Sequence, residues 1–167
     1  MNALLTSVLA GLILGAIVYF VKSRIATQPR LRLRVLPYGS MSFSESPGTI
    51  TCSWNQKLEI YNLTAFPALN VTFVWPDSAR QLPVAQLDPP HLNAMETKTL
   101  EFKIAKAFPR EDVIACRDRF KELLPVELRR IAVVLQYQND RGSAFYTRYE
   151  KTDATETSTF HRIKPKI

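Results

Sequence analysis

The sequence predicts a mainly β chain in which a single N-terminal transmembrane helix precedes an antiparallel β-sandwich with one connecting helix. Three observations predict this class. Residues 1–21 contain no charged side chain. Much of the remaining chain alternates between apolar and polar residues, as half-buried strands do, and turn-forming residues interrupt the alternation about every ten residues. At 167 residues with 46% hydrophobic content, the chain has the length of one ordinary domain and a composition unlike that of disordered proteins.

The N-terminal segment, residues 1–22, is expected to be an uncleaved membrane-spanning helix. A run of about 20 apolar residues at about 1.5 Å each matches the roughly 30 Å hydrocarbon core of a bilayer. A helix also satisfies its own backbone polar groups in lipid. The alternative is a secretory signal, which requires a basic segment before the apolar run and small residues at a cleavage site. Here no basic residue precedes the run, and bulky Tyr19 and Phe20 end it.

A cluster of basic residues follows the helix and predicts its orientation. The first acidic residue is Glu45. Because basic flanks are retained in the cytoplasm, we expect the N-terminus outside and the C-terminal domain in the cytoplasm, at an inner membrane of bacterial type. The same cations are expected to contact anionic lipid head groups, and the simpler alternative is that they only fix topology. The cluster consists of Lys22, Arg24, Arg30, Arg32 and Arg34.

Small side chains recur every four residues along the predicted helix, at Ala3, Ser7, Gly11 and Gly15. Four residues slightly exceed one helical turn, so these side chains form one gently spiralling stripe. Such stripes allow two helix backbones to pack closely. The stripe therefore predicts a homo-oligomer through the helix, and the alternative is that Gly and Ala are simply common in membrane helices.

The rest of the chain divides into a basic juxtamembrane linker (23–29), a β-sandwich domain (30–163) and a basic tail (164–167). A helix is expected at about 110–124, where apolar residues have helical spacing and proline lies in the first turn. Residues 139–142 have the chemistry of a hairpin turn. Strands are expected at 30–35, 49–53, 57–64, 69–75, 97–104, 130–138 and 143–151, with possible edge strands near 82–87 and 159–163.

Six to eight short strands with one connecting helix resemble an immunoglobulin-like two-sheet sandwich. The resemblance is one of architecture. Cys52 precedes Trp54 by only two residues, and Cys116 falls in the predicted helix, so the Cys and Trp pattern of antibody domains is not in register. Residues 58–71 also look like the strand–turn–strand entry of many membrane-tethered bacterial sandwich domains, which implies no particular site residue.

The residues that usually carry chemistry are sparse and dispersed. Cys52 and Cys116 are expected to be reduced thiols in a cytoplasmic domain. The spacing of the two cysteines and two histidines matches no zinc pattern, and we expect no metal, no cofactor and no enzyme activity. Asn62 and Asn70 begin glycosylation sequons, which would matter only if the domain were luminal. The aromatic residues near the predicted hairpin are assigned to the core and to cross-strand pairs rather than to a binding surface.

The net charge of +7 is concentrated at the two ends of the chain. Residues 22–38 carry five basic and no acidic side chains, residues 161–167 carry three basic ones, and residues 39–160 carry 14 basic and 15 acidic ones. A nearly neutral domain argues against specific nucleic-acid binding. The sequence therefore favours a membrane-anchored, non-catalytic module that binds the membrane surface or an unidentified protein. The alternative is a membrane-perturbing effector of defence or phage type that oligomerises through its helix.

Overall fold

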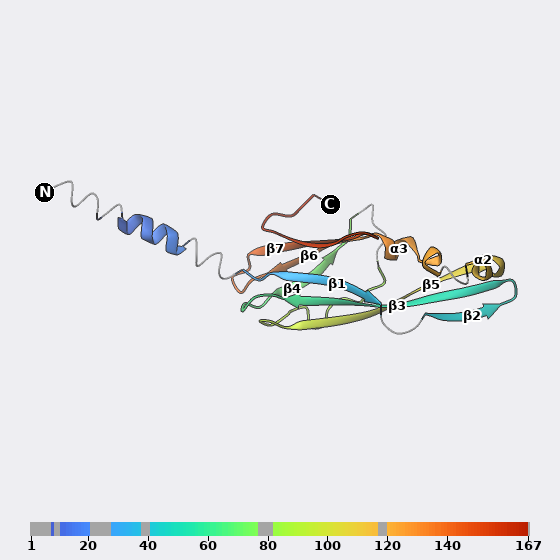
Figure 1. The fold of residues 1–167 in the computed structure, drawn as a ribbon. Helices are drawn as coiled ribbons and strands as arrows, with labels where there is room; N and C mark the ends of the chain where they lie inside the picture. Colours follow the sequence, from blue (N-terminus) through green and yellow to red (C-terminus); the bar gives the residue numbers. More distant parts are fainter. Residues whose placement is uncertain are drawn as a thin grey trace.

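The fold consists of two antiparallel four-stranded sheets that face each other around one core (Figure 1). The computed structural model describes Val8 and residues 11–20, 28–37, 41–76, 82–116 and 120–166. The mainly β prediction is confirmed. The first sheet contains β1 (Leu31–Pro37), β2 (Ser42–Ser46), β3 (Thr49–Asn62) and β5 (Thr97–Pro109). The second contains β4 (Leu69–Val74), β6 (Ile131–Gln138), β7 (Ala144–Lys151) and β8 (Glu156–His161).

The long strand β3 organises the first sheet. It has 14 residues and pairs with β5 along almost its whole length. On its other side, β1 pairs with the second half of β3 and β2 with the first half. The two strands expected at 49–53 and 57–64 are therefore one strand. The polar stretch between them hid this continuity, because Gln56 occupies an inward, buried position where alternation predicts an apolar residue.

Strand β2 was not expected from the sequence. It is joined to β3 by a tight turn in which Gly48 has φ +79°, a conformation that favours glycine. All five residues of β2 are exposed. A strand without a buried face shows no alternation of apolar and polar residues, so hydrophobic periodicity could not predict it.

The second sheet follows the sequence closely. Strand β6 buries Ile131, Val133, Leu135 and Tyr137, the residues expected on one face. The hairpin to β7 turns at 139–142 as predicted, and Gly142 has φ +75°. The amide side chain of Asn139 holds this turn, because its Oδ1 accepts hydrogen bonds from the backbone N–H groups of Arg141 (3.1 Å) and Ser143 (2.9 Å). Strand β8 is present at 156–161, and residues 82–87 form no strand.

The single helix expected at about 110–124 is instead a series of short helical pieces. They are α2 (Arg110–Ala115), the 3-10 turn η1 (Phe120–Leu123) and α3 (Val126–Arg129). Neither α2 nor α3 has a side-chain cap at its N-terminus, and helices this short gain little stability by themselves. Arg129 donates hydrogen bonds to the carbonyls of Leu124 (3.0 Å) and Glu122 (2.8 Å), which stabilises an irregular path rather than a continuous helix.

The two sheets are joined along the free edge of β1 by side chains rather than by backbone pairing. The hydroxyl of Ser158 on β8 accepts a hydrogen bond from the Leu33 N–H and donates one to the Leu33 carbonyl, both at 3.3 Å. Further along, Glu156 accepts from the Val35 N–H (3.3 Å) and Lys151 donates to the Val35 carbonyl (3.1 Å). Edge strands normally leave such groups open to another chain, so this polar seam closes the edge.

At the beginning of β1, a buried cycle of hydrogen bonds joins the two sheets. It connects Leu31 with Tyr137 and Thr147. Tyr137 and Thr147 are fully buried, and their hydroxyls lie 2.9 Å apart. Thr147 donates to the Leu31 carbonyl at 3.0 Å, and the Leu31 N–H donates to the Tyr137 hydroxyl at 3.4 Å. Every polar group of this cycle therefore has a partner, as buried polar groups require.

The N-terminal segment is described only in part. Val8 and residues 11–20 are helical and exposed, while residues 1–7, 9–10 and 21–27 lie outside the described residues. Among the helices that the structure describes, none combines the length and the apolar character needed to cross a bilayer. The membrane-spanning helix therefore stays a prediction.

Candidate functional site

The most distinctive surface lies where the chain enters the sandwich, and we call it the linker end. It comprises residues 28–30, 63–67, 93–96, 139–143 and 161–164. The pairings Leu31–Asn62 and Tyr61–Thr97 bring the ends of β1, β3 and β5 together in the first sheet, and those of β6 with β7 and of β7 with β8 do so in the second. In Figure 1, the N-terminal helix leads into this end of the sandwich.

Asn62 organises two loops of the linker end. It is 2% exposed, and its Nδ2 donates to the carbonyls of Phe66 (2.7 Å) and Asn93 (2.8 Å). Its Oδ1 accepts from the Thr64 N–H (3.1 Å) and the Thr64 hydroxyl (2.9 Å). The backbone N–H of Met95 in turn donates to the Thr64 carbonyl at 3.0 Å. Asn62 thus has a structural role, and its amide nitrogen is not presented to solvent.

Three large apolar side chains project from the linker end into solvent. Leu63 is 54% exposed, Met95 71% and Ile163 83%. They come from three loops that are far apart in sequence. The Leu63 N–H donates to the Arg30 carbonyl at 2.9 Å, and the bonds around Asn62 connect Leu63 to Met95. Ile163 follows Arg162, whose side chain is hydrogen-bonded to Gln28 just before β1, so all three residues belong to one end of the molecule.

Basic side chains lie at the same end of the molecule as Leu63, Met95 and Ile163, which we call the apolar tips. Arg162 donates through Nε to the Gln28 side chain at 3.2 Å, and the Arg30 guanidinium lies 5.3 Å from the centre of the Phe160 ring. Arg141 and Arg162 both line a cavity of about 300 Å³, whose other lining residues include Gln28. The two basic regions of the sequence, the linker side and the tail, are therefore brought together.

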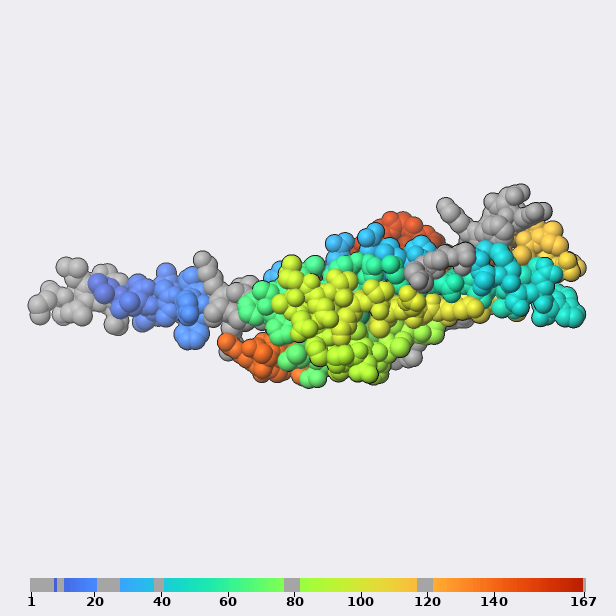
Figure 2. Space-filling view, turned by 90° about the horizontal axis from the view of Figure 1, so that it is seen from below, coloured from blue at the N-terminus to red at the C-terminus, as the bar shows by residue number. Residues whose placement is uncertain are grey.

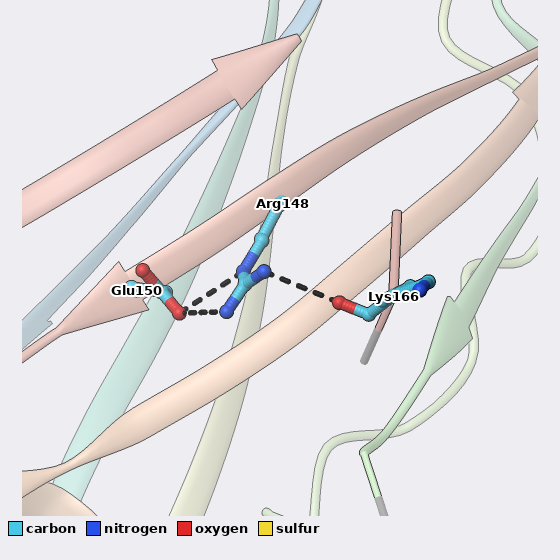
Figure 3. A network of polar contacts seen from close by, with 3 residues as sticks. All are labelled: Arg148, Glu150 and Lys166. Carbon is cyan, nitrogen blue, oxygen red and sulfur yellow. Dashed lines mark hydrogen bonds and ion pairs between the residues drawn. The ribbon is translucent and has the colours of Figure 1, made fainter. Parts of the chain in front are cut away.

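The tail beyond the linker end runs back beside the second sheet. Figure 3 shows Arg148 donating through Nη1 to the Lys166 carbonyl at 3.2 Å while its Nε and Nη2 donate to Glu150 at 3.0 and 2.6 Å. This contact directs the final described residues away from the linker end. Figure 2 shows the sandwich as an elongated body, with the helical N-terminal residues beyond one of its two ends.

The other predicted lipid-contacting arginines lie on the broad outer face of the first sheet. Arg32 and Arg34 are exposed on that face of β1, as the alternation predicts. Arg34 pairs across the sheet with Glu59. The pKa of the Glu59 carboxyl is lowered, first by the hydrogen bond it accepts from the Tyr61 hydroxyl and then by Lys57 and Arg34. The charge of Arg34 is thus partly balanced within the sheet.

The remaining predicted site residues belong to the N-terminal segment. Gly11 and Gly15 are helical, and a Cβ added to either would meet no atom of the described chain within 4 Å. Ala3, Ser7, Lys22 and Arg24 lie outside the described residues. The two described members of the stripe, Gly11 and Gly15, therefore have free space beside them. The role of the stripe in self-association stays a prediction.

The two cysteines are free thiols in different surroundings. Cys52 is fully buried in the core, and burial raises the pKa of its thiol. Cys116 is half-buried at the end of α2, and its Sγ donates to Glu122 at 3.8 Å. His161 has a buried Nε2 without a hydrogen-bond partner in the structure. Within the described ranges, His, Cys, Asp and Glu side chains form no group of three or more that could hold a metal ion.

A wider cavity of about 470 Å³ lies at the opposite end of the second sheet, between α3 and the loop that joins β7 to β8. Its lining includes two acidic side chains, Glu127 and Glu150, and two basic ones, Arg130 and Lys151. This balanced lining indicates no preference for an anion or a cation, in contrast to the linker end.

The sequence revealed the basic residues of the linker end but not the surface they form. The basic tail contains no motif that indicates a role, and Leu63, Met95 and Ile163 each look like an ordinary loop residue in the sequence. No local pattern in the sequence marks these three residues as neighbours, because only the strand order brings their loops to one end. No protein-family model, curated protein or solved structure matches this chain, so the function is argued from its own residues.

Proposed function

We propose that this chain is a single-pass membrane protein whose β-sandwich acts as a non-catalytic interaction module at the cytoplasmic surface of the membrane. In this proposal residues 1–22 span the bilayer, 23–29 link the helix to the sandwich at 30–163, and 164–167 form a basic tail. The sandwich would contact anionic lipid and present its remaining surface to a protein partner.

The observation that carries the proposal is the character of the helical residues 11–20. All ten are exposed, with Leu12 and Leu14 each at 66% and Ile17 at 53%. They belong to an uncharged run of 21 residues. A helix that is apolar on every side needs a protein core or a lipid environment to cover it, and the described part of the sandwich does not cover this one. A bilayer would do so.

Two features of the sandwich support a cytoplasmic orientation. Both cysteines are free thiols, as is usual in a reducing compartment. Asn62, the first sequon asparagine, has a buried amide nitrogen that donates two hydrogen bonds, which is incompatible with a glycan at that atom unless the loops rearrange. These features agree with the positive-inside rule applied to the linker.

We further propose that the sandwich is immunoglobulin-like. In immunoglobulin domains the first, second, fifth and fourth strands form one sheet, in that order, and the third, sixth and seventh form the other. Here β1, β3 and β5 are neighbours in one sheet, and β4, β6 and β7 are neighbours in the other, which matches this arrangement except that no strand that the structure describes beyond β5 corresponds to the fourth. Strand β2 is then an added hairpin strand and β8 an added edge strand. This architecture commonly serves binding rather than catalysis, which favours the module over an enzyme.

Membrane extraction and protease protection test the proposal on the full chain. The chain should resist extraction by alkaline carbonate, and the sandwich should be digested in inverted vesicles but protected in right-side-out vesicles. The matched variant Leu12→Arg with Leu14→Arg places two charges in the apolar run at a cost of about 3 kcal/mol each, and it should be extracted. Extraction of the unmodified chain contradicts the anchor, and digestion in right-side-out vesicles contradicts the orientation.

The openness of the glycine stripe favours a second candidate, a membrane-perturbing effector of defence or phage type that oligomerises through its helix. Overexpression would then arrest growth and depolarise the membrane. Gly11→Ile with Gly15→Ile should abolish both effects, while Ala16→Ile, off the stripe, should not. If overexpression leaves growth and membrane potential unchanged, the interaction module is favoured.

A further inference from the structure

We propose that the linker end of the sandwich docks directly onto an anionic bilayer, with Leu63, Met95 and Ile163 entering the interfacial region and Arg30, Arg141 and Arg162 contacting lipid phosphates. This inference rests on the proposed anchoring and names the lipid-contacting surface, which is the end of the sandwich rather than the outer face of β1.

The chemistry of the linker end fits a bilayer interface. Peripheral membrane surfaces combine apolar side chains that reach the acyl boundary with cations that attract anionic head groups. The three apolar tips are more than half exposed and lie at the end of the sandwich nearest the linker, whereas the similarly exposed Ile114 and Val126 lie on the helical segments away from it. Exposed apolar side chains ringed by polar ones mark an interaction surface.

The charges of the linker end are predominantly positive. It carries four basic side chains, on Arg30, Arg141, Arg162 and Lys164, and two acidic ones, on Glu96 and Asp140. The cavity between Arg141 and Arg162 has a volume of about 300 Å³ and carries no carboxylate in its lining. A phosphate group placed there would meet two guanidinium groups, which bind phosphate through paired donors.

The covalent path to the predicted helix keeps this surface near the bilayer. Gln28 follows Phe20 by eight residues, so a fully extended chain between them spans at most about 28 Å. The opposite end of β3 lies further away by the length of a 14-residue strand, about 45 Å. Only the linker end is therefore confined to the neighbourhood of the membrane.

The arrangement of the tips is preorganised rather than loose. Asn62 joins the loop that carries Leu63 to the turn that carries Met95 through its two Nδ2 bonds. Arg162 is oriented by Gln28, whose side chain is buried. A preorganised surface loses less conformational entropy on docking than a flexible one.

Quenching of an introduced tryptophan by lipid tests the docking on the full chain. Leu63→Trp would be compared with Val126→Trp, which replaces another exposed apolar residue (60% exposed) at the far end of β6. Both variants would be reconstituted into vesicles of phosphatidylcholine with phosphatidylglycerol, containing phosphatidylcholine brominated on its acyl chains. Emission of Leu63→Trp should fall roughly twofold relative to unbrominated vesicles, beyond the change of the native tryptophans, and Val126→Trp should not change.

Charge reversal separates electrostatic docking from simple tethering. Arg141→Glu with Arg162→Glu should abolish the quenching of Leu63→Trp, whereas Lys103→Glu with Arg110→Glu, the same charge change away from the linker end, should leave it intact. Unchanged urea midpoints would verify that both pairs fold. Quenching that persists in Arg141→Glu with Arg162→Glu overturns the role of the two arginines. Quenching that is equal in vesicles of phosphatidylcholine alone, whose head group is zwitterionic, overturns the requirement for an anionic bilayer.

The docking and the anchor can fail separately. Absence of quenching in Leu63→Trp overturns the docking, whether or not the chain resists carbonate extraction. If Leu63→Trp is also shielded from aqueous iodide, a protein contact or a second copy of the chain covers the linker end instead of lipid. Extraction by carbonate contradicts the anchor alone, because quenching by anionic vesicles would still report docking of the sandwich.

Discussion

Replacement of Asn62 is expected to destabilise the sandwich more than any other single polar change at the linker end. The side chain is 2% exposed and makes four hydrogen bonds, with lengths of 2.7, 2.8, 2.9 and 3.1 Å. Each such bond contributes about 1 kcal/mol net, and the four are not additive because they share one side chain. We expect Asn62→Ala to lower the free energy of unfolding by about 2–3 kcal/mol.

Asn62→Asp is a sharper form of the same test, because it changes the chemistry and not the shape. The amide nitrogen Nδ2, which donates both hydrogen bonds, becomes a single carboxylate oxygen that faces the carbonyls of Phe66 and Asn93. A buried charge without a partner costs about 3–5 kcal/mol, so Asn62→Asp should be less stable than Asn62→Ala near neutral pH. Protonation of the introduced carboxyl should recover part of the difference as the pH is lowered.

Asn70→Gly is the matched control, since it removes the second sequon and a single exposed hydrogen bond, from Asn70 Nδ2 to Gln138 at 2.8 Å. Glycine tolerates the φ of +51° at this position, so the change should be within about 0.5 kcal/mol. Urea unfolding of the full chain in a non-ionic detergent, followed by tryptophan emission, measures all three variants. If Asn62→Ala loses less than about 0.5 kcal/mol, Asn62 does not organise the loops as argued.

Three further outcomes are expected. Ser158→Ala should cost about 1–2 kcal/mol in urea unfolding, because the Leu33 N–H and carbonyl lose their partner at the sheet edge; an unchanged midpoint contradicts the polar seam. Burial raises the pKa of Tyr149, so the neutral phenol stabilises the fold below about pH 10 and this stability is lost as the pH rises further; Tyr149→Phe should flatten that loss in alkaline urea titrations. A thiol reagent should modify half-buried Cys116 in the folded chain and reach buried Cys52 only on unfolding; equal rates would contradict the burial.

The sequence predicted those strands whose two faces differ. The alternation in β1 and β6 predicted which residues are buried, and the hairpin at 139–142 followed from its turn residues. The exposed strand β2 gave no alternation, and the inward polar residue Gln56 divided β3 into two apparent strands. Hydrophobic periodicity fails in both situations for the same reason, since it detects the contrast between faces and not the backbone pairing itself.

The helix expected at about 110–124 shows the limit of local spacing. Val113 and Leu123 are buried as a helical pattern requires, but they are buried from separate short elements. Spacing predicts which side chains meet the core, and it does not predict whether the backbone between them continues its hydrogen bonding. That depends on tertiary partners such as Arg129, whose bonds to two carbonyls of the segment could not be anticipated from its position.

The linker end shows why a surface is harder to predict than a strand. Its apolar tips come from three connections separated by tens of residues, and only the strand order places them together. The position of the net charge was equally hard to predict. Residues 22–38 and 161–167 lie at opposite ends of the sequence, yet Arg162 donates a hydrogen bond to the side chain of Gln28. A charge acts on a membrane only within about 10 Å at 0.1 M salt. The fold brings Arg30 and Arg162, one from each basic end of the sequence, to the side where the predicted helix attaches, while Arg148 holds Lys166 back beside the second sheet. Part of the positive charge of the two chain ends therefore gathers at one surface, which the sequence alone could not show.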